Sequence, residues 1–186
     1  MSKKSVKQIV FCAILLALAF ITSYIRLFNM PWGGAVTLFS MLFIVLAANW
    51  YGTGSGIVLG VALGILVFLQ APIFLSIPQF CLDYLVSFGA LGLAGLFRNR
   101  KHGLVIGYIV GILGRGVFAT IAGYIFWATY IPPEFPKAIE GLYSVVYNFS
   151  YILAEGLITC IVISIPQVSK ALNMVKKMAL EEQDRI

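Results

Sequence analysis

Charged residues are scarce in this sequence, and that scarcity excludes an ordinary water-soluble fold. Only 11% of the 186 residues are charged, whereas 61% are hydrophobic, and the mean hydropathy is +0.98. A soluble domain carries about 25% charged residues. With so few charged residues, a water-soluble fold would have too little polar surface to cover the apolar side chains of this chain. The composition therefore predicts an integral membrane protein.

Side chains that carry catalysis or bind metals are also few. The sequence has one histidine and three cysteines, and that histidine, His102, falls in the basic turn RNRKH. Neither a nucleophile beside a base nor a cluster of metal ligands is visible, so an intramembrane enzyme is not favoured. The string GTGSG at 52–56 is not followed by the Lys-Ser or Lys-Thr of a phosphate-binding loop. We expect no catalysis, no metal and no cofactor, and we expect Cys12, Cys81 and Cys160 to be unpaired within the membrane.

Long apolar runs predict six membrane-spanning helices. About 20 apolar residues cross a hydrocarbon core of about 30 Å, and runs of roughly this size lie near 9–28, 35–50, 54–71, 79–97, 104–129 and 141–165. We therefore expect an all-α membrane protein with one six-helix domain over residues 1–186. The tail 167–186 carries an apolar stripe with helical spacing, which predicts a helix at the cytoplasmic membrane surface. Its members are Val168, Ala171, Leu172, Val175 and Met178.

The distribution of positive charge predicts the orientation of these helices. Cytoplasmic segments of membrane proteins carry an excess of Lys and Arg. If both termini are cytoplasmic, only Arg26 and Lys137 fall outside. The cytoplasmic side then receives Lys3, Lys4, Lys7, Arg98, Arg100, Lys101, Lys170, Lys176, Lys177 and Arg185. Both termini are therefore expected in the cytoplasm.

Small residues spaced by four predict close contacts between helices. The third predicted helix carries Gly56, Gly60 and Gly64, and the fifth carries Gly103, Gly107 and Gly111. The first helix has the same spacing at Ala13 and Ala17. For that pair two interpretations stay open, packing within the bundle or contact with another protein.

Polar side chains within the predicted helices mark a candidate binding site. An ionised carboxylate in hydrocarbon costs about 2.5 kcal/mol or more, so Asp83 is expected to have a partner or a ligand. With both termini inside, several polar and aromatic side chains share its level in the outer half of the membrane. A carboxylate, an amide, phenols and indoles suit a flat, nitrogen-containing small molecule, including a cationic one. The group comprises Trp32, Asp83, Tyr84, Trp127, Tyr143 and Asn148.

Two structural alternatives stay open for these residues. The tryptophans and tyrosines also suit the aromatic belt at a membrane surface. Asp83 can instead form a buried ion pair with Arg115 of the fifth helix. Arg115 precedes Trp127 by about 12 residues and so lies about 18 Å deeper. A bond from Arg115 to Glu155 is geometrically easier.

Four stretches resemble the substrate-binding S component of energy-coupling factor (ECF) vitamin transporters, in particular the thiamine-binding branch. They are MPWGGAVTL at 30–38, LDYLVSFGALGLAGLF at 82–97, IAGYIFW at 121–127 and YSVVYN at 143–148. The resemblance implies the S-component fold and a bacterial plasma-membrane subunit that binds its vitamin with high affinity. It also implies docking on a transmembrane scaffold subunit that is driven by two cytoplasmic ATPases.

The resemblance assigns roles to individual residues. It implies that Asp83 is the acidic ligand-binding residue and that Trp32 lies on a gate loop. It implies that Ala13 and Ala17 contact the scaffold. Other substrate-binding positions fall on Tyr84, Gly123, Trp127, Tyr143 and Asn148.

One position departs from the pattern of the thiamine-binding branch. Relatives of that branch tend to carry a histidine where this chain has Ala119, and the acidic residue here is the shorter aspartate. The expected ligand is thiamine, with pyridoxine or hydroxymethylpyrimidine as alternatives. A self-sufficient secondary transporter is a further alternative. It is less favoured because no internal repeat and no acidic relay across the membrane are visible.

Overall fold

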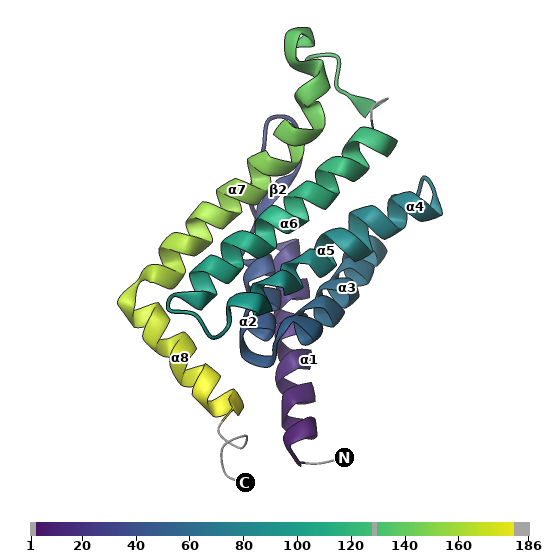
Figure 1. Cartoon of the computed structure of the whole chain (residues 1–186). Helices are drawn as coiled ribbons and strands as arrows, with labels where there is room; N and C mark the ends of the chain where they lie inside the picture. Colours follow the sequence, from purple (N-terminus) through teal and green to yellow (C-terminus); the bar gives the residue numbers. More distant parts are fainter. Residues whose placement is uncertain (1–2, 128–129, 181–186) are drawn as a thin grey trace.

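A computed structural model describes residues 3–127 and 130–180 of the chain as a bundle of long apolar helices. In chain order these helices are α1 (Lys3–Tyr24), α2 (Ser40–Tyr51), α3 (Thr53–Gln70), a composite fourth helix (Ile77–Phe97), α6 (Gly103–Phe126), α7 (Tyr143–Ser164) and α8 (Pro166–Leu180). The start of α1 and the end of α8 lie at the same end of the bundle (Figure 1). That arrangement agrees with two termini on one side of the membrane.

The six predicted membrane helices are all present, and the second is shorter than predicted. Among the residues that the structure describes, five helices are long and apolar enough to cross a membrane, whereas α2 has only 12 residues. At 1.5 Å per residue α2 is about 18 Å long, which is less than the hydrocarbon thickness of about 30 Å. Most of its side chains are buried by the surrounding helices. The second helix is therefore a core helix enclosed by longer ones.

The segment between α1 and α2 forms a small antiparallel hairpin, so the predicted helices 9–28 and 35–50 are wrong at these ends. Strand β1 (Arg26–Asn29) pairs with β2 (Ala35–Thr37). Gly33 and Gly34 turn the chain with φ of 102° and 79°, values that glycine adopts without a steric penalty. These two short strands are the exception to the predicted all-α class.

Smaller differences appear at the other helix ends. The predicted helix 104–129 ends at Phe126, and residues 128–129 lie outside the described residues. The predicted helix 141–165 corresponds to α7, which is preceded by the 3₁₀ turn η4 (Lys137–Leu142). That residues 1–186 form one domain stays a prediction.

The composite fourth helix changes its winding along its length. It consists of α4 (Ile77–Phe80), the π-helical turn η1 (Cys81–Val86), α5 (Ser87–Gly89) and the 3₁₀ segment η2 (Ala90–Phe97). This fourth helix lies between α3 and α6. The regularly spaced glycines of α3 (Gly56, Gly60 and Gly64) and of α6 (Gly103, Gly107 and Gly111) pack on it. A methyl group on Gly60 would collide with the backbone of Phe88, and one on Gly107 with the backbone of Ala94. The predicted close helix contacts are confirmed.

Ala13 and Ala17 do not take part in packing within the bundle. Both are exposed on the outer face of α1, whereas Leu15 and Ala19 face inward and are buried. The interpretation of this pair as an intramolecular contact is therefore wrong.

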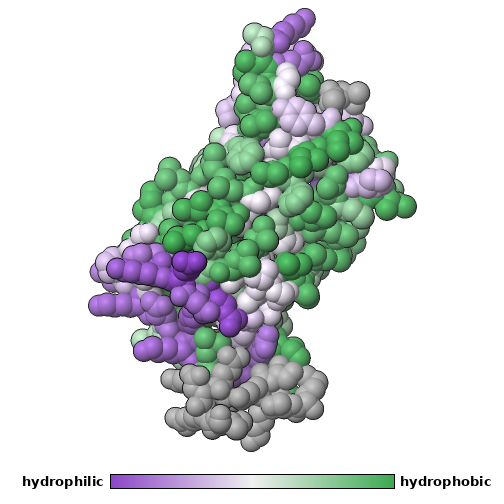
Figure 2. All heavy atoms as spheres, in the orientation of Figure 1, coloured by the Kyte–Doolittle hydropathy of each residue, from purple (hydrophilic) through white to green (hydrophobic). Residues whose placement is uncertain are grey.

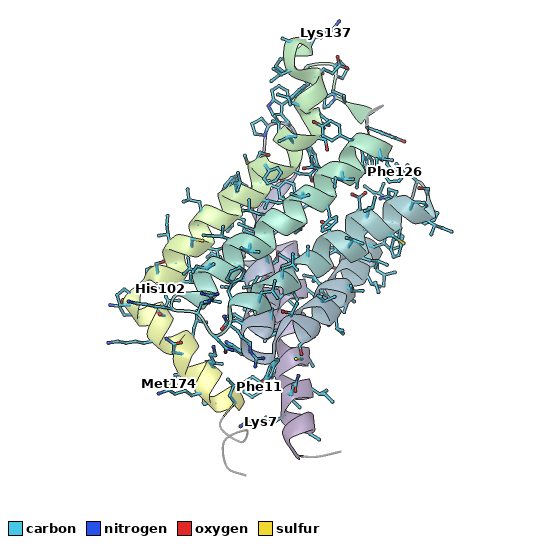
Figure 3. All side chains as sticks on the ribbon, in the orientation of Figure 1. Lys7, Phe11, His102, Phe126, Lys137 and Met174 are labelled. Atoms are coloured by element: carbon cyan, nitrogen blue, oxygen red, sulfur yellow. The ribbon has the colours of Figure 1, made fainter. Side chains whose placement is uncertain are left out.

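The surface separates into an apolar middle and polar ends. On the face shown in Figure 2, hydrophobic residues cover the middle of the bundle and hydrophilic residues gather towards its two ends. Lys137 lies at the end opposite Lys7, while His102 lies towards the end that carries the termini (Figure 3). This distribution agrees with cytoplasmic termini and an outward-facing Lys137.

Helix α8 closes the cytoplasmic end of the bundle and contacts α1, α2 and α7. Leu172 and Val175 pack against the core as their stripe predicts, but Ala171 and Met178 are exposed. Lys176 points inward, where its Nζ donates to Asn49 Oδ1 at 2.9 Å. The end of the predicted tail, 181–186, lies outside the described residues.

Candidate functional site

A cavity of about 450 Å³, which we call the aromatic cavity, opens between the fourth helix, α6 and α7. Six of the seven residues predicted to bind a substrate line it: Asp83, Tyr84, Gly123, Trp127, Tyr143 and Asn148. Ala119 also lines it, at the position where relatives tend to carry histidine. The structure thus brings together side chains that are more than 60 residues apart in the sequence.

Asp83 is held in this wall by two donors. Its Oδ2 accepts hydrogen bonds from Gln79 Nε2 at 2.6 Å and from Trp127 Nε1 at 3.0 Å. Within the described part of the chain, no hydrogen bond reaches Oδ1. One carboxylate oxygen is therefore fixed by the protein and the other is left for a ligand. The alternative ion pair with Arg115 is wrong, because Asp83 forms no salt bridge with it.

The π-helical turn η1 places Asp83 and Tyr84 at the cavity. Wide turns of this type often occur at functional sites, where one extra residue redirects the side chains around it. The Tyr84 ring packs edge-on against Phe68 with a centroid distance of 5.2 Å. Gly64 of α3 leaves room for the backbone of Tyr84. Local winding and one glycine together fix this wall.

Helices α6 and α7 form the opposite wall through a chain of hydrogen bonds. Ser144 Oγ donates to the carbonyl of Thr120 at 2.8 Å, and Asn148 Nδ2 donates to the carbonyl of Ser144 at 3.0 Å. Tyr151 OH donates to Asn148 Oδ1 at 3.3 Å. A side chain at Gly123 would collide with Ser144. Gly123 therefore allows the close approach of the two helices that this wall requires.

Trp32, the seventh predicted residue, does not line the aromatic cavity. It packs edge-on against the buried Phe135 at 5.1 Å, and Phe135 packs in turn against Tyr143 at 5.0 Å. Tyr143 OH also donates to the Trp32 carbonyl at 3.3 Å. Trp32 therefore lies above a lining residue as part of a cover made by two loops.

The hairpin lies along one face of α7. Tyr143, Tyr147, Tyr151 and Glu155 follow one another at intervals of four residues, which places them on one side of a helix. Side chains added at Gly33 and Gly34 would collide with the Tyr147 and Tyr151 rings. We call these four α7 side chains the α7 ladder. Because each step of the ladder contacts the hairpin or its tip, α7 determines where the hairpin lies.

Glu155 forms the lowest step of the ladder and holds the base of the hairpin. Its Oε2 accepts from the Thr37 backbone N–H at 2.9 Å and from Thr37 Oγ1 at 2.7 Å. Its Oε1 accepts from the Met41 N–H at the start of α2, at 3.4 Å. The expected bond from Arg115 to Glu155 is not formed, so that part of the sequence interpretation is wrong. The buried carboxylate instead binds backbone donors at a helix N-terminus.

A second cavity of about 390 Å³, which we call the polar cavity, lies on the other side of Arg115. Hairpin residues, the outer ends of α1 and α3, and α7 surround it. The two cavities share a wall made of Val67, Phe88, Arg115, Tyr147 and Tyr151.

Comparison with known proteins decides the family. The model of the thiamine transporter protein family (Thia_YuaJ) matches residues 9–175, which extend from α1 into α8. The chain belongs to this family. It is a family of transporters rather than enzymes, and its members are multi-pass proteins of the bacterial plasma membrane.

Individual relatives agree with the family over nearly the whole chain. The thiamine transporter ThiT of Bacillus subtilis (strain 168) is 27% identical over 176 residues, which cover 86% of this chain and 90% of that protein. The structure of ThiT from Listeria monocytogenes has a TM-score of 0.73 at 24% identity and covers 92% of this chain and 98% of its own. A structure of the S component of a bacterial ECF transporter has a TM-score of 0.61 at 16% identity, with 97% and 99% covered. The predicted S-component fold is confirmed.

Sequence reasoning missed several residues of the site in this family member. Gln79 is fully buried and holds Asp83. Its position four residues before Asp83, one helical turn away, is the signal that was available. Tyr147 and Tyr151 line both cavities. They follow Tyr143 at successive intervals of four residues, a spacing that was also visible in the sequence.

Proposed function

We propose that the protein is the substrate-binding S component of an ECF-type importer and that its substrate is thiamine. The aromatic cavity carries the proposal. It joins a half-satisfied carboxylate, an amide and several aromatic faces in a volume typical of small-molecule sites. Family membership and the S-component fold support the same conclusion.

The chemistry of thiamine fits these side chains. Its thiazolium ring is a cation that aromatic faces attract, and Trp127, Tyr84 and Tyr143 supply such faces. Its aminopyrimidine ring carries an amino group that can donate to the free Oδ1 of Asp83. Asn148 keeps one amide hydrogen and one lone pair beyond its bonds to Ser144 and Tyr151. The site thus recognises both rings without covalent chemistry, and we propose that it uses no metal or cofactor.

Ala119 favours a second candidate ligand. A methyl group at this position of the cavity wall offers no hydrogen bond to a polar ring. Pyridoxine and hydroxymethylpyrimidine lack the thiazolium ring and place fewer demands on this wall. They are therefore the competitors against which thiamine should be measured.

We also propose the partners of the protein, a transmembrane scaffold subunit and two cytoplasmic ATPases. The exposed small residues Ala13 and Ala17 support docking through α1, because small side chains let a partner helix approach closely. Apolar neighbours surround this pair on the same outer face, including Ile14 and Leu18.

Ligand titration of the purified protein tests the substrate. Binding of thiamine, pyridoxine and hydroxymethylpyrimidine is followed by tryptophan fluorescence, which Trp127 in the cavity wall should report. We expect thiamine to bind at least tenfold more tightly than the other two, a difference of about 1.4 kcal/mol. Equal or tighter binding of either competitor would overturn the thiamine assignment. Uptake that persists in cells without the ATPase subunits would instead support the secondary-transporter alternative.

A further inference from the structure

The polar cavity contains an excess of positive charge. Its charged lining residues are Arg26, Arg115 and Glu155, and neutral polar groups such as Asn29 and Gln70 complete its lining. It opens where α1 and α3 end, in the outer half of the protein. Nothing in the proposed binding of thiamine uses this space.

Arg115 has no counter-ion among the residues that the structure describes. Its guanidinium lies over the Phe88 ring, 4.2 Å from the centroid, and 5.9 Å from that of Tyr151. Its Nε is buried without a hydrogen-bond partner. The two rings fix the orientation of the guanidinium but leave its N–H donors unsatisfied.

Neither of the nearby carboxylates, Glu155 and Asp83, forms an ion pair with Arg115. Glu155 faces the same cavity, yet both its oxygens accept hydrogen bonds from Thr37 and Met41. Asp83 lines the aromatic cavity, where Gln79 and Trp127 donate to one of its oxygens, and it forms no salt bridge with Arg115. A partly buried guanidinium without a partner is unfavourable, and an anion beside it offsets part of that cost.

We propose that the polar cavity binds a small inorganic anion, held by Arg115 and assisted by Arg26. The guanidinium of an arginine stays positively charged and carries five N–H donors, which a small anion can accept. The cavity volume of about 390 Å³ leaves room for hydrating waters around the anion, and its polar lining supplies their partners. Chloride, which is abundant outside cells, is the probe for this site.

Arg115 also connects the anion to the vitamin, a step that rests on the proposed function. Its side chain belongs to the wall between the two cavities. A thiazolium cation in the aromatic cavity faces this positive charge and is repelled by it. An anion on the other side of the wall cancels the repulsion, so the two ligands favour each other's binding reciprocally.

The first experiment measures anion binding without vitamin. Thermal unfolding of the purified protein is compared in sodium chloride and in sodium gluconate at equal ionic strength. Chloride at about ten times its dissociation constant should raise the unfolding temperature of the wild type by about 3 °C. Arg115→Gln should abolish the difference. Arg100→Gln removes an equal charge from the exposed cytoplasmic turn and should behave as the wild type does.

The second experiment measures thiamine affinity in the same two salts. We expect binding about five- to tenfold tighter in chloride for the wild type, within the usual range of coupling between sites. Arg115→Gln should bind equally well in both. If that variant does not fold, Arg26→Gln takes its place and should weaken the chloride effect.

The outcomes separate this inference from the proposed function. If thiamine binds with equal affinity in chloride and gluconate, and the thermal stability is equal in both salts, the anion site is overturned and the proposed function is left intact. Stabilisation by chloride without any thiamine binding supports the anion site and overturns the proposed function. A chloride effect that survives in Arg115→Gln overturns the assignment to this residue.

Discussion

At the scale of single residues, Asp83 illustrates how a charge is accommodated inside a membrane protein. Gln79 and Trp127 both donate to one oxygen, which offsets part of the desolvation cost of the carboxylate. The same bonds fix the direction of the other oxygen. Asp83 is thus stable enough to remain in the wall and still able to bind a ligand.

Asp83→Asn should weaken thiamine binding by about 1.5 to 3 kcal/mol, or roughly ten- to hundredfold, the usual contribution of a hydrogen bond to a charged group. The asparagine oxygen can still accept from Gln79 and Trp127, so the free energy of unfolding should change little. Calorimetric titration and thermal unfolding of the same variant measure the two effects. A destabilised variant that binds thiamine at wild-type affinity would contradict the ligand role.

At the scale of the elements, the hairpin depends on α7 for its position. The α7 ladder contacts it from the tip at Trp32 to the base at Thr37. The loop containing Phe135 joins this cover from another part of the chain, and α1 also contacts strand β2. Movement of the hairpin tip therefore breaks few contacts, while its base stays attached through Glu155.

Trp32→Ala should speed the release of thiamine more than it slows its association. The substitution removes the indole that packs on Phe135 and so weakens the closed cover without altering the cavity wall. Stopped-flow fluorescence measures both rates. Leu27→Ala, on exposed strand β1 of the same hairpin, is the control and should leave them unchanged. Wild-type release from Trp32→Ala would argue against a gate.

Ala13→Trp should abolish thiamine uptake and leave binding intact, because a bulky ring on the outer face of α1 keeps a partner helix at a distance. Uptake into cells and titration of the purified variant provide the two measurements. Val58→Trp is the matched control, since Val58 is 66% exposed on α3 and should tolerate a ring facing lipid. Joint loss of binding and uptake in Ala13→Trp would show that the face supports the fold itself.

At the scale of the whole molecule, α8 ties the cytoplasmic end together through a partly buried lysine, Lys176. Burial lowers the pKa of Lys176 from its ordinary value of 10.5, and the positive charge of Arg98 lowers it further. The unfolded chain therefore binds this proton more tightly than the folded one does. The resulting destabilisation is present below the lowered pKa and is relieved as pH rises through it towards 10.5.

The contribution of Lys176 to stability should therefore increase with pH in the alkaline range just below 10.5. Lys176→Met removes the group and should flatten this part of the pH profile of thermal unfolding. Lys177→Met removes an equal charge from the exposed neighbouring position and should retain the wild-type slope. Parallel profiles for the wild type and Lys176→Met would refute the burial argument.

The helical framework and its orientation could be predicted from the sequence, and the hairpin could not. The length of the apolar runs determines which segments span the membrane, and the placement of Lys and Arg determines their orientation, so both follow from the sequence. Residues 26–28 and 35–37 were included in the predicted helices 9–28 and 35–50, because a short apolar stretch does not distinguish a strand from a helix end. The expected bond from Arg115 to Glu155 was argued from the depth of the two residues along their helices alone. Depth along a helix follows from residue number, whereas the direction of a side chain around the bundle needs the fold.

The pairing of Glu155 with the start of α2 has a consequence for biogenesis. Helix α2 is too short to insert alone, and its first backbone donors find their acceptor on a helix that the ribosome makes more than 100 residues later. Until α7 enters the membrane, the N–H groups of Thr37 and Met41 lack this acceptor. The nascent chain thus completes its central helix only after nearly the whole protein has been synthesised.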